Sequence, residues 1–303
     1  MILGILYYDG GISMEDYKLG VKTSIITIIV NVVLSAIKIA AGVIGKSSAM
    51  LADGVHTLSD VLTTFVVIIG LKISSKEADE KHPYGHEKYE PVFAKLLSVL
   101  LGATGLFIGY EGIMILRSGD IQTPGRIALI AAIISIVTKE GMYWYTVKVA
   151  KKIKSLSMEA DAWHHRSDAF SSVGTFVGIL GARMGLKILD PIAAIIVSVF
   201  IIKVGVDLYI KSVRGLVDEA ADDETIEKIK NLVFSADGVK DIKNMKTRIF
   251  GNKIYVDIEI FVDGNINVTQ GHNIAEKVHD LIENNIEDVK HCMIHVEPEI
   301  SNI

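Results

Sequence analysis

Residues 53–60 read Asp-Gly-Val-His-Thr-Leu-Ser-Asp, and residues 161–168 read Asp-Ala-Trp-His-His-Arg-Ser-Asp. Both stretches have the spacing Asp-x-x-His-x-x-x-Asp, and both interrupt long apolar runs. Residues three, four and seven apart lie on one face of an α-helix, so each stretch predicts a helix with a short polar stripe. An unpaired charge at membrane depth costs from about 3 to more than about 10 kcal/mol. The two stripes must therefore face each other or water.

Apolar runs long enough to cross a bilayer lie around and between the two stripes. Half of the 303 residues are hydrophobic, and the mean hydropathy of +0.40 disfavours an ordinary soluble enzyme. A helix needs about 20 residues to span a lipid bilayer. An all-α domain of six transmembrane helices is predicted, at roughly 22–45, 49–73, 92–116, 126–148, 160–183 and 188–210.

Charge and cysteine content indicate the orientation and the compartment. Twelve Lys and Arg residues near the span ends fall on one side of the predicted membrane and five on the other, so both termini are predicted to be cytoplasmic. The first 17 residues lack the basic start of a cleaved signal peptide. The single cysteine, Cys292, excludes a disulfide framework within one chain. These features predict a multi-pass protein of the cell (plasma) membrane.

The chain divides into three predicted segments: cytoplasmic residues 1–17, a membrane domain of residues 18–214 and a cytoplasmic domain of residues 215–303. The last segment has 9 basic and 18 acidic side chains, whereas the first 214 residues carry a net charge of +4. A helix opens the last segment at Asp222, and two strand-like runs, a second helix near 268–285 and a strand at 289–296 follow. This αββαβ order is typical of the ferredoxin-like α+β fold.

Two imidazoles and two carboxylates of the stripes form a candidate metal site, made of His56, Asp60, His164 and Asp168. Such a set can close tetrahedrally around a divalent cation, and it suits Zn²⁺ better than Ca²⁺ or Mg²⁺. The alternative is a buried polar network that fixes helix packing without metal.

Other ionisable residues in the spans have weaker signals. Asp53 and Asp161 lie one turn away and are expected to support the ligands or to line the path to them. On an ideal helix His165 points about 100° away from His164, so it is expected to be an outer or interfacial residue rather than a ligand. Lys139 and Glu140 are charges within a span that can face a cavity, and no chemistry is assigned to them.

Three separated segments carry a resemblance to a known family: Ser-Ala-Met-Leu-Ala-Asp-Gly-Val-His-Thr-Leu-Ser-Asp (48–60), His-Pro-Tyr-Gly-His (82–86) and His-His-Arg-Ser-Asp (164–168). In order and spacing they resemble the signature segments of the cation diffusion facilitator family, over essentially the whole chain after Tyr17. The resemblance implies a proton-coupled exporter of divalent metal that works as a homodimer, with the four residues of the candidate metal site as its transport site.

Several metals are candidates for the cargo. Some family members have Asp where this chain has His56, and Zn²⁺ is the usual cargo when His stands there. The doubled histidine at 164–165 also occurs in relatives that handle Mn²⁺ or Fe²⁺, and Co²⁺ and Cd²⁺ stay possible.

The resemblance also implies sites outside the membrane. Asp79, His82 and His86 match loop positions that hold a second metal in some members, although this segment can also be a solvated turn. Lys88 and Asp218 match a charge pair that links the two subunits near the membrane face.

In the tail, His272, His295 and Glu297 match metal positions at the dimer interface. Strand alternation places His295 and Glu297 on the same side of the last strand, where they can share a cation. A polar domain surface is the alternative. Metal bound to this acidic tail would be regulatory.

Two functions of other classes compete with transport. An intramembrane zinc hydrolase needs an open metal position and a general base, and the sequence lacks the usual His-Glu-x-x-His pattern. A membrane metal sensor would bind metal without moving it. The absence of a Gly-rich phosphate loop argues against nucleotide as a partner, and nothing points to nucleic acid.

Overall fold

The computed structural model describes residues 14–44, 48–118, 126–183 and 188–299. Most of the predicted N-terminal segment, residues 1–13, lies outside this part of the chain. The chain divides into two compact units. Among the described residues, one unit contains those between 14 and 75 and between 89 and 213, and the other contains residues 76–88 and 214–299.

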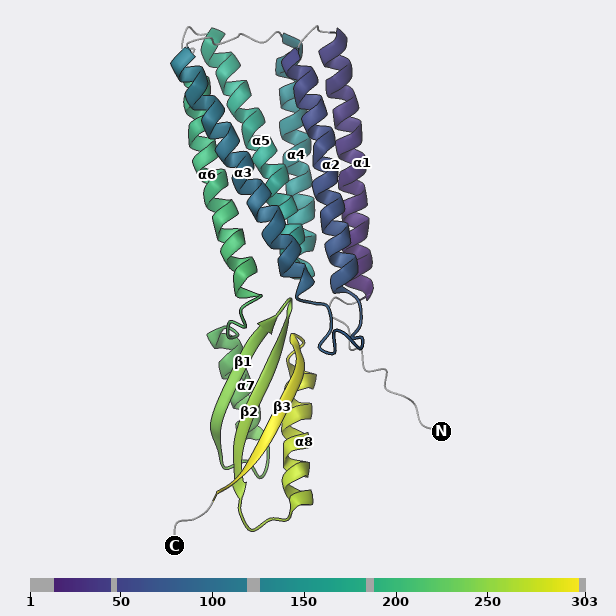
Figure 1. Cartoon of the computed structure of the whole chain (residues 1–303), viewed down its shortest axis with the longest axis vertical. Helices are drawn as coiled ribbons and strands as arrows, with labels where there is room; N and C mark the ends of the chain where they lie inside the picture. Colours follow the sequence, from purple (N-terminus) through teal and green to yellow (C-terminus); the bar gives the residue numbers. More distant parts are fainter. Residues whose placement is uncertain (1–13, 45–47, 119–125, 184–187, 300–303) are drawn as a thin grey trace. The chain divides into compact units, whose positions relative to one another are not determined.

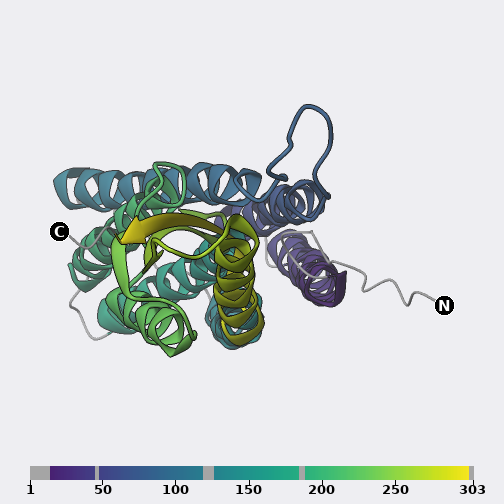
Figure 2. The same ribbon diagram turned by 90° about the horizontal axis from the view of Figure 1, so that it is seen from below.

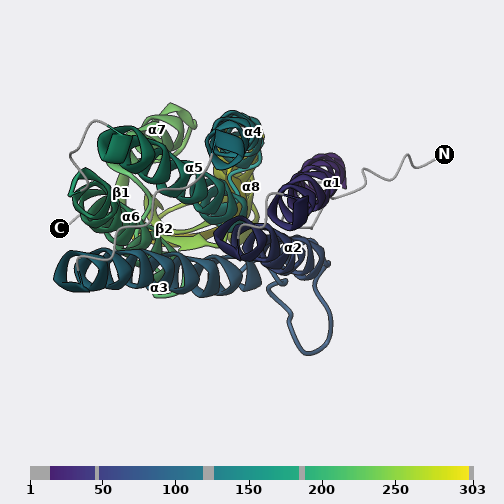
Figure 3. The ribbon, with the colours of Figure 1, turned by 90° about the horizontal axis from the view of Figure 1, so that it is seen from above.

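The first unit is the predicted bundle of six long helices (Figure 1). They are α1 (Met14–Ile44), α2 (Ser48–Ser74), α3 (Tyr89–Ser118), α4 (Arg126–Lys152), α5 (Leu156–Arg183) and α6 (Leu189–Arg214). Seen from above, α2 lies beside α1 and α3, and α5 contacts α2, α3 and α4 (Figure 3). The polar stripes of α2 and α5 are thus on neighbouring helices.

The bundle is polar inside and apolar outside, as α1 illustrates. Its buried face carries Thr27 and Asn31, while Ile25, Ile29 and Val33 are exposed. A surface of this kind is stable against lipid and unfavourable in water. By length and composition, three described stretches qualify as membrane spans: Met14–Ala41, Gly54–Ser74 and Tyr89–Ser118. The polar stripe of α5 lowers the hydropathy of that helix.

The second unit contains α7 (Asp223–Ser235), β1 (Asp241–Phe250), β2 (Lys253–Asp263), α8 (Val268–Asn285) and β3 (Val289–Glu299). The sheet order is β1-β2-β3, with β1 antiparallel and β3 parallel to β2. Asp222 caps α7 and Asn267 caps α8, which explains where both helices begin. The predicted αββαβ fold is confirmed.

Both helices of this unit cover the same face of the sheet (Figure 2). Ile229 of α7 and Ile282 of α8 pack with Val256, Ile258 and Ile260 of β2, and all five are fully buried. The central strand therefore carries the core of the domain, as its alternating pattern predicted.

The loop between α2 and α3 is tied to this sheet within the second unit. Lys290 Nζ of β3 lies 2.5 Å from Glu87 Oε1 and donates to the Tyr84 carbonyl at 3.2 Å. The Tyr255 hydroxyl donates to the same carbonyl at 3.1 Å. The side chains of Lys290 and Glu87 are 7% and 0% exposed, so this ion pair is buried.

Breaking this pair is expected to release the loop. Lys290→Met in the full chain leaves the Glu87 carboxylate buried without its cation, which costs about 3–5 kcal/mol. Hydrogen exchange of residues 76–88 should accelerate accordingly. The control is Lys230→Met, which removes an exposed pair with Glu227 and should change stability by only about 0–1 kcal/mol. Equal exchange in both variants would contradict the prediction.

Candidate metal transport site

Three of the four predicted ligands, His56, Asp60 and Asp168, gather between two neighbouring helices, and the fourth, His164, contacts Asp60. His56 and Asp60 lie on α2, and His164 and Asp168 lie on α5. The His164 Nε2 atom is 3.3 Å from Asp60 Oδ1, and the His56 Nε2 atom is 4.0 Å from Asp168 Oδ1. Ligand atoms of His56, Asp60 and Asp168 all lie within 4.8 Å of one another. The Asp60 side chain is 2% exposed and that of His56 is 56% exposed, so the cluster is open beside His56.

A fifth residue, Lys139 of α4, belongs to the same cluster. Its Nζ donates to Asp60 Oδ2 at 2.6 Å and to Asp168 Oδ2 at 2.8 Å, and the residue is 1% exposed. Sequence reasoning assigned no chemistry to Lys139. The signal that was missed is charge balance, because two buried carboxylates at membrane depth need a cation. Among the described membrane helices, Lys38 and Lys139 are the only buried lysines.

Asp161 forms a second polar cluster beside the site. It is 1% exposed and accepts a hydrogen bond from Thr64 Oγ1 at 3.2 Å. The His165 Nε2 atom is 3.4 Å from Asp161 Oδ2, and His165 is fully buried. Of the two predicted positions for His165, the outer face is excluded, because α5 has neighbours on several sides. The side chain of Asp53 lies outside the described part of the structure.

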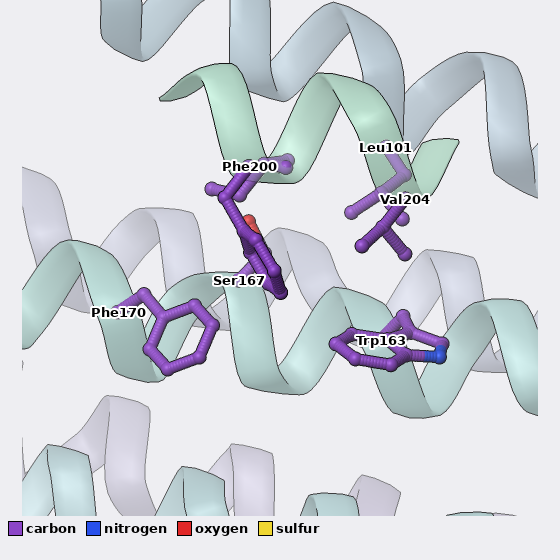
Figure 4. A pocket seen from close by; sticks show the side chains of 7 residues that line it. Leu101, Trp163, Ser167, Phe170, Phe200 and Val204 are labelled. Atoms are coloured by element: carbon purple, nitrogen blue, oxygen red, sulfur yellow. The ribbon is translucent and has the colours of Figure 1, made fainter. Parts of the chain in front are cut away.

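Another face of α5 is apolar and packs against α3 and α6. The ring centroid of Phe200 lies 5.6 Å from that of Phe170 and 6.1 Å from that of Trp163. A small pocket there is lined by Leu101, Trp163, Ser167, Phe170, Phe200, Ile201 and Val204 (Figure 4). This packing fixes the rotation of α5, so that His164 and Asp168 point toward α2 and α4.

The loop residues Asp79, His82 and His86 also come together. The Asp79 Oδ1 atom is 3.0 Å from His82 Nδ1, and Asp79 Oδ2 is 3.4 Å from His86 Nε2. The Glu77 carbonyl oxygen lies 3.1 Å from His86 Nδ1, which is a contact that orients Nε2 toward Asp79. Ligand atoms of the three residues lie within 4.8 Å of one another, a spacing that a single metal ion can bridge.

The structure does not gather His272, His295 and Glu297 in the described part of one chain. The His295 Nε2 atom lies 3.4 Å from Glu297 Oε1, as strand alternation predicted. Glu297 also accepts a hydrogen bond from Lys243 at 2.6 Å, which lowers the pKa of this carboxyl group. His272 instead lies 3.9 Å from Glu276. A shared site of these three residues stays a prediction for paired copies.

The predicted charge pair forms within one chain. Lys88 Nζ donates to Asp218 Oδ1 at 2.9 Å and lies 5.0 Å from the centroid of the Phe250 ring. A link between subunits through these residues stays a prediction.

A bundle of membrane helices around imidazoles and carboxylates, followed by a ferredoxin-like domain, defines a membrane protein that handles metal cations. The family model described as "Cation efflux transmembrane domain" matches residues 24–217, and "Cation efflux protein, cytoplasmic domain" matches residues 221–299. The chain belongs to the cation diffusion facilitator family of metal efflux transporters.

Similar proteins occur in archaea, bacteria and plants. The uncharacterized transporter MJ0449 of Methanocaldococcus jannaschii is 36% identical over 91% of this chain and 97% of its own length. The manganese efflux system protein MneP of Bacillus subtilis is 34% identical, over 94% of this chain and 98% of its own. The magnetosome protein MamB of Magnetospira sp. is 31% identical, over 89% of this chain and 92% of its own length. These relatives span the membrane domain and the tail together.

The loop cluster is expected to weaken in acid. The backbone N–H of His82 donates to Asp79 at 2.7 Å, and this bond is the main cause of the lowered pKa of Asp79. A lowered pKa means that the carboxylate stabilises the loop above its ordinary pKa of about 4. This contribution is lost as the pH falls through the lowered value.

Asp79→Asn should remove this acid-dependent step. The measurement is hydrogen exchange of residues 76–88 as a function of pH, corrected for the intrinsic pH dependence of exchange. Glu80→Gln removes the same charge from the same loop and should leave the step in place. If both variants keep the acid-dependent step in hydrogen exchange, Asp79 is not the source of that step.

Proposed function

We propose that this chain exports divalent transition-metal cations from the cytoplasm in exchange for protons. The observation that supports this proposal best is the cluster of His56, Asp60 and Asp168 between α2 and α5, with His164 in contact with Asp60. Membrane helices rarely bury ionisable residues without a function in transport or ligand binding. The site would face the cytoplasm to load the cation and the outside to release it, by alternating access.

Protons can drive this cycle because they compete with the cation for the same atoms. Imidazole and carboxylate ligands bind metal only when they are deprotonated, and histidine ordinarily titrates near neutral pH. A proton that arrives from the outside therefore displaces the cation, and it leaves again when the site returns to the cytoplasm.

Zn²⁺ is the cargo that the ligand set favours, because two nitrogens and two oxygens suit tetrahedral coordination. Mn²⁺ is the second candidate, because a relative that is 34% identical is named for manganese efflux. The two cargoes can be separated by direct measurement of flux.

We place the protein in the cell membrane as a homodimer, with both termini in the cytoplasm. The uneven distribution of Lys and Arg around the helices supports this orientation. The cytoplasmic-domain match supports pairing through the tails. Metal bound between two tails of net charge −9 each would reduce their repulsion.

The test is metal uptake into proteoliposomes under an imposed pH gradient. The wild-type chain should transport Zn²⁺ or Mn²⁺ only with the gradient present. Asp60→Asn and Asp168→Asn should reduce this flux to the level of empty vesicles, because each removes a charged ligand. Glu140→Gln is the matched control, since Glu140 also lies on a membrane helix but pairs with Arg166 at 3.3 Å.

Each outcome separates the competing functions. Flux that does not depend on the pH gradient would contradict proton exchange, but it would still show that the protein transports metal. Binding without flux by folded protein would indicate a metal sensor. Unimpaired flux in both aspartate variants would show that the cation takes another route through the bundle.

A further inference from the structure

The carboxylates of the transport site use their two oxygens differently. The Oδ1 atoms of Asp60 and Asp168 lie toward His164 and His56, at 3.3 Å and 4.0 Å. The Oδ2 atoms of both residues accept hydrogen bonds from Lys139 Nζ, at 2.6 Å and 2.8 Å. One ammonium group thus holds one oxygen of each carboxylate, and the other oxygen of each faces an imidazole.

We propose that Lys139 determines the metal specificity of the transport site. Its ammonium group stays hydrogen-bonded to the Oδ2 atoms of Asp60 and Asp168. The cargo is therefore bound by the two Oδ1 atoms and the two imidazoles. This inference rests on the proposed function of the same site. It assigns Lys139 a positioning role and requires no change in its protonation.

Lys139 stays in place because, within the described residues, its Nζ has hydrogen-bond partners only in Asp60 and Asp168. The residue is 1% exposed, and both hydrogen bonds that the structure describes for its Nζ go to these two carboxylates. Displacement by the cargo would leave a buried ammonium without a partner, which costs several kcal/mol. Keeping both hydrogen bonds of Lys139 costs less, because each carboxylate has a second oxygen that can bind the cation.

The consequence is a limit on the number of oxygen ligands. With Lys139 in place, the site offers two oxygens and two nitrogens, a set that suits four-coordinate transition metals. Ca²⁺ takes six to eight oxygens and often binds carboxylates through both atoms. Lys139 therefore discriminates against Ca²⁺, and its positive charge weakens the binding of every divalent cation.

The chain offers a matched control in Lys38 of α1. This lysine is also buried, 2% exposed, and its Nζ donates to Thr57 Oγ1 at 3.1 Å. Lys38→Met therefore removes the same charge from the same bundle without releasing an oxygen of Asp60 or Asp168.

The experiment measures binding of Zn²⁺, Mn²⁺ and Ca²⁺ to the purified full-length protein in lipid nanodiscs, by calorimetric titration and competition. In Lys139→Met, the preference for the transition metal over Ca²⁺ should fall by about tenfold or more, the usual scale for residues that orient metal ligands. In Lys38→Met the preference should equal that of the wild type.

The proposal is overturned if folded Lys139→Met binds metals with the wild-type preference or binds none. If this variant does not fold, Lys139→Arg decides, because a guanidinium can also hold one oxygen of each carboxylate. Lys139→Arg should keep the preference, and its loss there would refute the proposal. Failure of the proposed function is separate, because it appears as wild-type protein without gradient-driven flux.

Discussion

The structure depends on the pairing of charged side chains that are buried inside the membrane domain. Asp60, Asp168 and Lys139 come from three different helices and are each nearly or fully buried. None of them is stable alone at membrane depth, so α2, α5 and α4 must be turned until the three groups meet. The apolar exterior of the bundle follows from the same constraint, because the polar side chains are collected inside.

Outside the membrane, charge pairing has another role. The buried pair of Lys290 and Glu87 and the contacts of Tyr84 hold the loop between α2 and α3 on the sheet of the tail. The same loop carries the Asp79 cluster and directly follows α2, the helix with His56 and Asp60, along the chain. Metal bound in the loop would therefore act on a segment that is connected to both units.

Much of this could be predicted from the sequence, for identifiable reasons. Run length and alternation predicted the helices and the αββαβ tail, and the repeated spacing of Asp and His predicted which residues of α2 and α5 converge. Lys139 was missed because a lone charge has no periodic partner, and its role depends on how α4 is placed. The position of His165 was left open between an outer and an interfacial one, because helix geometry gives an angle but not the number of neighbouring helices. The predicted tail site would need a second copy of the chain, which spacing within one chain cannot describe.

The double hydrogen bond of Lys139 also has an electrical consequence. With neutral imidazoles, two carboxylates and one ammonium give the empty site a charge of −1, and a divalent cation changes it to +1. A membrane potential acts on each moving elementary charge with about 2.3 kcal/mol per 100 mV. In the proposed cycle of alternating access, an inside-negative voltage would therefore oppose the outward step of the loaded site and the inward step of the empty site equally. With two protons on the returning site, both steps would carry +1 in opposite directions, and the proposed exchange would be independent of voltage if it moved one cation for two protons.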